Sequence, residues 1–243
     1  MGYSACSLAA LAAKKQGGYF NRLKMSETLK INGGVKIGMA NVTRPLGSLT
    51  VTKNRLDING GLFGNLSFLP GDIIALKPYN DNALLGNNIQ IVHNIPNYKR
   101  DVYFNTRKDP QTIVNQITTT GFFDTIAIDS TIEKTVRERQ KQGAFPIKRL
   151  WLIITGLVWN IGILTDIIIF GSNGFPNSPP QFNFAIISFG FALAFFIGLL
   201  ASQQVRKVVL KPFSTLEDIQ TTASFIGFIM LMLFIGFSAN RFM

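Results

Sequence analysis

Few residues of this chain are of the types that carry out chemistry, and the sequence keeps them apart. Cys6 is the single cysteine and His93 the single histidine, so neither an internal disulfide nor a zinc site of several cysteines and histidines can form. His93 ends a predicted strand, and we expect it to make a local hydrogen bond rather than to bind a metal. The pairs Gly33–Gly34 and Gly60–Gly61 predict turns and match no phosphate-binding loop. No nucleophile can be paired with a base, so the residues predict no catalytic, metal or cofactor site and no enzyme.

Asp166 is the one ionisable residue in a strongly apolar setting, because it lies within Leu150–Phe170. A carboxylate inside a membrane span can belong to an ion or proton path. Asp166 is only four residues from the end of the apolar stretch, however, and Asn160 falls on a different face of a helix. We therefore expect a carboxylate near the lipid headgroups, and a small transporter or channel subunit is the alternative.

Three apolar segments, the first of which contains Asp166, predict a membrane region over residues 147–243. Leu150–Phe170 would span roughly 31 Å as a helix, at about 1.5 Å per residue, which is the thickness of a bilayer's hydrocarbon core. Phe182–Leu200 contains no charge, and Ala223–Ala239 is at the short limit for a span. We expect two or three transmembrane helices, with the third segment either crossing or lying partly in the interface.

Positive charges next to these segments predict their orientation. The loop between the first two spans, residues 171–181, has no lysine or arginine. The positive-inside rule then places the N-terminal part of this multi-pass chain and residues 201–222 on the cytoplasmic-type side. The cations predicted to contact the membrane surface are Lys141, Lys148, Arg149, Arg206, Lys207 and Lys211.

Small residues recur within the first two spans and suggest sites of helix packing. Gly156 and Asn160 are four residues apart in the first span, and Gly190 and Gly198 lie in the second. Small side chains let helix backbones approach closely. Packing among the chain's own spans is the simpler interpretation, and contact with another membrane protein or self-association is the alternative.

The overall charge also points to the membrane as a partner. The net charge is +11, and most of it lies before residue 150, while 47% of the residues are hydrophobic. Such a surplus favours anionic lipid headgroups or nucleic acid. Beside membrane spans, the lipid bilayer is the simpler partner, and we expect no nucleic acid.

The N-terminal half is predicted to hold a β domain. Residues 1–31 are expected to be a flexible basic tail, with an organellar targeting segment as the alternative. Residues 32–107 contain seven short, partly alternating runs separated by turn residues, which is typical of a small antiparallel barrel or sandwich. Asp109 and Pro110 then predict the start of a helix, and Gly121 predicts its end.

Strands followed by one capping helix resemble a pleckstrin-homology-like (PH-like) domain, as carried by some bacterial membrane proteins. The resemblance covers residues 32–122 and implies a PH-like fold with a role in protein or lipid contact, without enzymatic activity. It does not extend to a phosphoinositide site, because the first hairpin carries a single cation, Arg44. The matching residues are Gly47–Thr52, Leu85–Gly86, Ile89–His93, Val102–Phe104 and Thr120–Phe122.

Residues 123–146 are predicted to form a charged, solvated helical connector, in which Glu133 and Arg137 lie one helical turn apart. The predicted fold class is therefore α+β, with a PH-like β domain followed by an all-α membrane region. The predicted function is that of a non-enzymatic, membrane-anchored interaction or assembly protein, such as an accessory subunit of a larger membrane complex. A peripheral sensor of anionic lipid is the second alternative beside the transporter.

Overall fold

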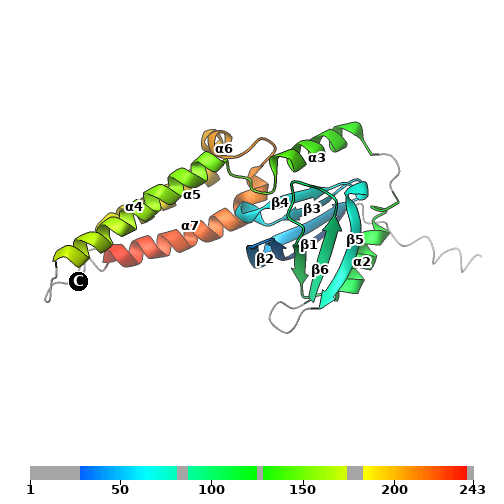
Figure 1. The fold of residues 1–243 in the computed structure, drawn as a ribbon, viewed down its shortest axis with the longest axis horizontal. Coiled ribbons are helices and arrows are strands. Elements are labelled where there is room, and N and C mark those ends of the chain that lie inside the picture. Colours follow the sequence, from blue (N-terminus) through cyan, green and yellow to red (C-terminus); the bar gives the residue numbers. More distant parts are fainter. Residues whose placement is uncertain (1–27, 81–86, 125–127, 174–182, 240–243) are drawn as a thin grey trace, which may run out of the picture.

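The computed structural model describes residues 28–80, 87–124, 128–173 and 183–239. A curled antiparallel sheet occupies one end of the molecule, and long helices extend away from it (Figure 1). This arrangement confirms the α+β fold class. Most of the predicted tail, up to residue 27, and the Leu85–Gly86 part of the resemblance lie outside the described residues.

Seven strands form one sheet in the order β4-β3-β2-β1-β7-β6-β5, and every neighbouring pair is antiparallel. Two short 3-10 turns, η1 (Gly61–Phe63) and η2 (Pro70–Asp72), lie in the connections. The strands are β1 (Thr28–Ile37), β2 (Ala40–Thr52), β3 (Leu56–Asn59), β4 (Asn65–Phe68), β5 (Ile73–Asn80), β6 (Asn87–His93) and β7 (Val102–Thr106).

Strand β1 begins inside the stretch predicted as tail. The reason is cross-strand pairing, since Leu29 lies opposite Val51 and Ile31 opposite Leu49, and all four contribute to the core. The pairing partner is about twenty residues away along the chain, so local composition did not reveal it.

Alternate residues of the strands point into the curl and form the core. Leu56, Leu66, Phe68, Val102 and Phe104 are fully buried there. Because side chains alternate across a strand, the intervening positions face outward and are largely polar. The sheet thus has one apolar inner face and one outer face that is free to carry other chemistry.

Helix α2 (Pro110–Thr119) covers the open side of the curl next to β5 and β6 (Figure 1). Asp109 is its N-cap, with the side chain accepting a hydrogen bond from the Thr112 backbone N–H at 2.8 Å, and Pro110 occupies the first turn. Ile113 and Ile117 are buried, each contributing about 1.5–3 kcal/mol by apolar burial. The predicted capping helix is therefore present at the predicted place.

Helix α3 (Ser130–Gln142) is capped by Asp129 and docks on the sheet instead of being solvated all round. Val136 and Gln140 are buried, and Gln140 donates hydrogen bonds to the Ser67 carbonyl and to the Asp72 carboxylate. Arg137 pairs with the same carboxylate at 2.6 Å. The charged face that suggested a solvated connector is thus partly a docking face.

Three long helices make up the rest of the chain: α4 (Arg149–Asn173), α5 (Asn183–Ala201) and α7 (Leu216–Ala239), with the short α6 (Gln203–Val209) between the last two. Within the described residues, these three long helices are long and apolar enough to cross a membrane. Helix α5 contacts both α4 and α7. Helix α7 starts before the predicted third segment, because the Thr215 N–H donates to the Asp218 carboxylate and caps its first turn.

The sheet is joined directly to the start of α7. The Leu62 N–H in η1 donates to the Thr222 hydroxyl, and Arg139 of α3 lies 4.0 Å from the Asp218 carboxylate. Gly61 has φ of +62°, and a Cβ there would collide with Thr222. The sheet therefore packs on the helical layer rather than hanging from a linker.

Candidate binding groove

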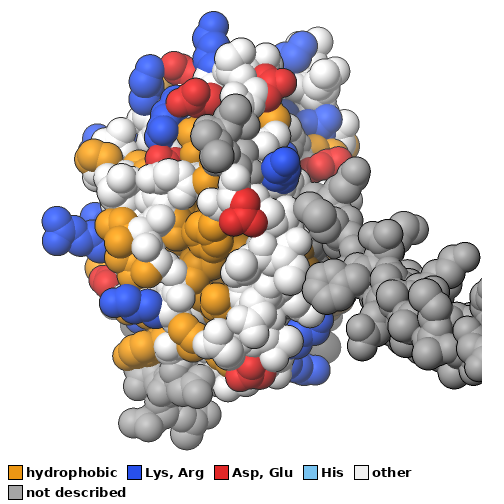
Figure 2. Space-filling view, turned by 90° about the vertical axis from the view of Figure 1, so that its right-hand side faces the viewer, with side chains coloured by type: hydrophobic (Ala, Val, Ile, Leu, Met, Phe, Trp, Pro, Cys, Tyr) orange, Lys and Arg blue, Asp and Glu red, His pale blue; other side chains and the backbone are white. Residues whose placement is uncertain are grey.

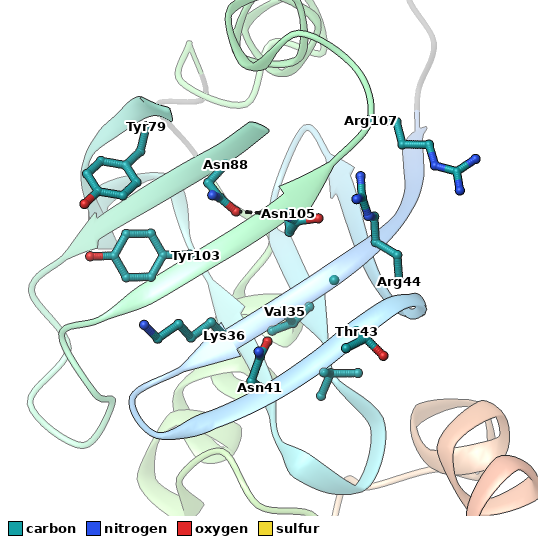
Figure 3. Close-up of a pocket in the computed structure, with 12 residues that line it drawn as sticks. Val35, Lys36, Asn41, Thr43, Arg44, Tyr79, Asn88, Tyr103, Asn105 and Arg107 are labelled. Carbon is teal, nitrogen blue, oxygen red and sulfur yellow. Dashed lines mark hydrogen bonds between the residues drawn. The ribbon is translucent and has the colours of Figure 1, made fainter. Parts of the chain in front are cut away.

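The outer face of the sheet carries a hollow of about 350 Å³ that crosses β2, β1, β7, β6 and β5 (Figure 3). Its position follows from strand alternation, since Val35 and Phe104 point inward while Lys36 and Tyr103 point outward from the same strands. We refer to this hollow as the outer groove. Its lining residues are Gly34, Val35, Lys36, Asn41, Val42, Thr43, Arg44, Tyr79, Asn88, Tyr103, Asn105 and Arg107.

Two asparagines form the centre of the outer groove. Asn88 of β6 lies directly opposite Asn105 of β7, and the Asn105 amide donates a hydrogen bond of 2.9 Å to the Asn88 carbonyl oxygen (Figure 3). Asn88 is buried and Asn105 is half-buried. This hydrogen bond fixes the orientation of both amides in the floor of the outer groove.

Two tyrosines stand at one end of the outer groove. The rings of Tyr79 and Tyr103 are 5.5 Å apart and tilted by 48°, and Gln90 donates to the Tyr103 hydroxyl at 3.4 Å. The Lys36 ammonium lies 5.6 Å from the centre of the Tyr103 ring, within range of a cation–π contact. This end combines apolar ring surface with hydroxyl groups and a positive charge.

Two arginines stand at the other end. Arg44 and Arg107 line the outer groove and also an adjoining hollow of about 530 Å³ that contains Lys30 and Lys108. Among the described residues, neither lining includes an aspartate or glutamate. A surface with cations and no acid attracts carboxylate or phosphate groups, and guanidinium groups bind both in a two-pronged geometry.

The arginine end exists because the strands separate there. The register of β1 with β2 shifts between Gly33 and Val35, which leaves extra residues around Arg44 on β2. Strand β1 pairs with β7 only from Gly34 onward, opposite Asn105, so the earlier part of β1 diverges from the end of β7. A Cβ at Gly33 would overlap the Phe104 ring and the Asn105 carbonyl, so glycine permits this close crossing.

No protein-family model matches this chain. No curated protein matches it either.

The predicted membrane-surface cations gather at the sheet end of the helices, where three of the six donate to backbone carbonyls. Lys148 donates to the carbonyls of Lys207 and Val208 at the end of α6. Arg206 donates to two carbonyls at the end of α5, and burial lowers the pKa of Lys211, which donates to the Gln142 carbonyl. These side chains satisfy helix ends.

The three remaining cations of that set behave differently. Lys207 is exposed on α6. Lys141 forms an ion pair of 2.8 Å with Glu138 on the exposed side of α3. Arg149 starts α4 and is exposed. All three side chains are accessible to solvent.

The four predicted helix-packing residues divide into two pairs. A Cβ on Gly190 would lie 3.3 Å from the Phe234 ring of α7, and one on Gly198 would lie 3.5 Å from Val205, so both face the chain's own helices. Gly156 has no neighbouring atom within 4 Å of a Cβ position, and Asn160 is exposed. Gly190 and Gly198 therefore pack within the fold, whereas Gly156 and Asn160 face outward.

Asp166 is buried at the junction of α4 and α5. Its carboxylate accepts hydrogen bonds from the backbone N–H groups of Phe184, at 3.1 Å, and Ala185. These are orphan donors of the first turn of α5, so the carboxylate acts as a cap supplied from the neighbouring helix. This contact joins the two helices across residues 174–182.

His93 makes the expected local hydrogen bonds. Its Nδ1 accepts from the Ile95 N–H at 3.2 Å, so Nε2 carries the proton and donates to the Lys99 carbonyl at 2.9 Å. Within the described ranges, no three His, Cys, Asp or Glu side chains are close enough to share a metal ion. The histidine is therefore a structural group at the end of β6.

A second exposed feature lies at the end of the molecule away from the helices. Figure 2 shows apolar side chains gathered there between charged ones. Exposed apolar residues of β5 and of the segment after α2 are Ile74 and Phe123. Patches of this kind commonly mark contacts with other molecules, but it lacks the defined polar geometry of the outer groove.

Among the groove residues, the sequence analysis considered only Arg44 as a possible ligand-binding residue. The sequence did not predict that five other groove residues lie together, because they come from β5, β6, β7 and the position directly after β7. These residues are Tyr79, Asn88, Tyr103, Asn105 and Arg107. A signal was present in the outward positions of β7, where the sequence has tyrosine and asparagine rather than the charged residues usual on a solvated face.

Proposed function

We propose that this chain is a non-enzymatic, membrane-anchored interaction protein that binds an acidic segment of a partner membrane protein in the outer groove. The observation that carries the proposal is the groove itself, in which Arg44 and Arg107 stand at one end and Tyr79 and Tyr103 at the other, with no acid among the lining residues that the structure describes. A curled seven-stranded antiparallel sheet covered by a helix after its last strand supports a PH-like assignment for residues 32–122.

The chemistry of the groove suits an extended acidic chain. Guanidinium groups hold carboxylates through paired hydrogen bonds, and tyrosine rings provide contact area at a small loss of side-chain entropy. The Asn88–Asn105 pair gives the groove a fixed, uncharged polar floor between the two ends. A lipid headgroup would occupy only the arginine end of the groove, whereas an extended peptide of several residues would contact both the arginine end and the tyrosine end.

The attachment of the sheet to α7 supports an anchored adaptor. The hydrogen bond from Leu62 to Thr222 and the Arg139–Asp218 pair hold the sheet at the end of the helical layer. If α4, α5 and α7 cross the bilayer, the groove stays at a fixed height above it. A partner confined to the same membrane then meets the groove at a high effective concentration.

A sensor of anionic lipid is the second candidate, and it is favoured by the cluster of Lys148, Arg206, Lys207 and Lys211 at the sheet end of the helices. Capping of helix carbonyls by three of these residues reduces what they offer to lipid. A transporter centred on Asp166 has less support, because two backbone N–H groups already account for that carboxylate.

The decisive experiment measures binding of labelled peptides to the full chain in mild detergent. Peptides with glutamate should bind, and the same peptides with glutamine should not. The double variant Arg44→Ala/Arg107→Ala should weaken binding about ten-fold or more, since hydrogen bonds to charged groups are lost.

The matched control is Arg100→Ala/Lys134→Ala, which removes the same charge from exposed sites outside the groove. Equal binding of the glutamine peptides, or an equal loss in the control, would contradict the proposal. If the groove variant instead lost binding only to vesicles with anionic lipid, the lipid sensor would replace it.

A further inference from the structure

One face of α4 has no partner among the described residues, although it carries a polar residue at its centre. Gly162 and Asp166 face α5, since a Cβ on Gly162 would collide with Ser188 and Asp166 caps α5. Successive helix residues are rotated by about 100°. Gly162 therefore lies about 200° from Asn160 around the helix, so Asn160 points away from α5.

The residues around Asn160 follow a seven-residue repeat. Ile153, Asn160 and Ile167 are spaced by seven and are all exposed, and Gly156 and Ile163 each follow one of them by three. This is the a and d pattern of a helix pair, with branched residues and one asparagine at the a positions. We call these five residues the α4 seam.

The Asn160 amide is only partly satisfied. One N–H donates to the Gly156 carbonyl at 2.7 Å, and neither its oxygen nor its second N–H has a partner among the described residues. Asn160 lies beside the midpoint of Arg149–Ile169, where a bilayer offers no water. A polar group left unpaired at this depth costs free energy that a partner amide can remove.

The Asn160 amide of a second copy can pair with the oxygen and the second N–H that Asn160 leaves unpaired. If two copies lie side by side in register, each Asn160 gives its second N–H to the oxygen of the other, so both groups are satisfied by the same residue. Both copies enter the membrane in the same direction, which makes the two helices parallel. Branched a residues with a single asparagine specify two parallel strands.

The α4 seam leaves space for a second helix to approach closely. No atom lies within 4 Å of a Cβ position on Gly156, so a neighbouring backbone can come close one turn from the amide. The one charge on this side of α4 in the described chain is Arg149, at the polar end of the helix, where water and salt screen it.

We propose that the α4 seam is the interface of a parallel homodimer in the membrane, with Asn160 hydrogen-bonded to Asn160 of the second copy. The proposal rests on the membrane crossing included in the proposed function and does not depend on what the outer groove binds.

Cysteine cross-linking in native membranes tests the seam position by position. In a Cys6→Ser background, Ile153→Cys and Ile167→Cys should each form a disulfide-linked dimer on mild oxidation. Ile161→Cys and Ile168→Cys are matched controls, because these isoleucines are at least as exposed but lie about 80–100° to one side. Equal cross-linking at all four positions, no dimer at either seam position, or a product with the mass of a foreign protein would each overturn the proposal.

A second measurement isolates the amide. Asn160→Leu should weaken dimerisation about ten-fold, as expected for loss of a membrane hydrogen bond, and Asn160→Gln should restore part of it. Ile168→Leu should change nothing. An unchanged dimer in Asn160→Leu would overturn the Asn160 pairing. Acidic-peptide binding by the same variants reports on the outer groove separately, so failure of one idea is distinguishable from failure of the other.

Discussion

The Thr222 hydroxyl of α7 accepts a hydrogen bond of 2.9 Å from the Leu62 N–H of η1, and donates one of 3.1 Å to the Ile219 carbonyl. Thr222 is almost completely buried, so this hydroxyl is a fixed joint between the sheet and a helix that can cross a membrane. The contact joins residues 160 positions apart in the sequence.

Replacing this joint should loosen the junction. Thr222→Val keeps the shape of the side chain but leaves the Leu62 N–H without its acceptor, and we expect a loss of about 1–2 kcal/mol of stability. Thermal unfolding of the detergent-solubilised protein measures the loss. Thr221→Val, at the neighbouring exposed position, is the control and should be within about 0.5 kcal/mol of the parent; a similar loss in both would mean that the joint is not specific.

Removing the Asp72 carboxylate should release α3. Its two oxygens accept from the Leu69 N–H, the Gln140 amide and Arg137, and the residue is buried. Asp72→Ala should cost about 3 kcal/mol, because it leaves two buried donors without their acceptor and removes the closest carboxylate partner of Arg137. Limited proteolysis should then cleave within α3.

The control for that experiment is Glu133→Ala, which removes the exposed ion pair with Arg137 at 3.8 Å. An exposed pair contributes about 0–1 kcal/mol. Protection of α3 from protease in the Asp72→Ala protein would contradict the docking of this helix.

Stability should fall in strong alkali through Tyr98. Burial raises the pKa of Tyr98 from 10.0 to about 12, so the folded state favours the neutral phenol more than the unfolded state does. The corresponding stability is fully present below pH 10 and is lost as the pH rises toward 12. Unfolding midpoints between pH 9 and 12 should therefore decline less in Tyr98→Phe than in the parent; parallel declines would exclude Tyr98 as a cause.

Asp166→Asn should act on structure and not on ion movement. The amide keeps one oxygen for the α5 N–H groups but loses the charge that favours a helix N-terminus, so we expect a loss of about 1 kcal/mol. Ion flux in reconstituted vesicles should be the same for both proteins. A flux that depends on Asp166 would restore the transporter as the leading function.

Much of the fold could be predicted because its signals are local. Alternation along the strands, the Asp109 and Pro110 helix start and the apolar spans each depend on neighbours a few residues away. The docking of α3 could not, because Asp72 and Arg137 are 65 residues apart in the chain. Their pairing depends on how the sheet curls.

The candidate groove was harder to foresee for a related reason. Arg44 and Arg107 share a hollow only because β1 changes register against β2 and parts from β7. The role of Asp166 was likewise hidden, since its partners Phe184 and Ala185 begin the next helix. A register shift and a contact between helices are tertiary features, which residue types alone do not encode.

The lysine and arginine contacts at the ends of α5 and α6 bear on how the chain is made. Lys148 precedes α4 and Arg206 follows α5, and if these helices cross a membrane, the two charges would help to orient the nascent chain during insertion. In the folded protein, Lys148 donates hydrogen bonds to the Lys207 and Val208 carbonyls. Arg206 donates to the Leu199 and Leu200 carbonyls. Once these hydrogen bonds have formed, they must break before the orientation of the helices can be reversed. The native fold would therefore stabilise the orientation that was set during synthesis.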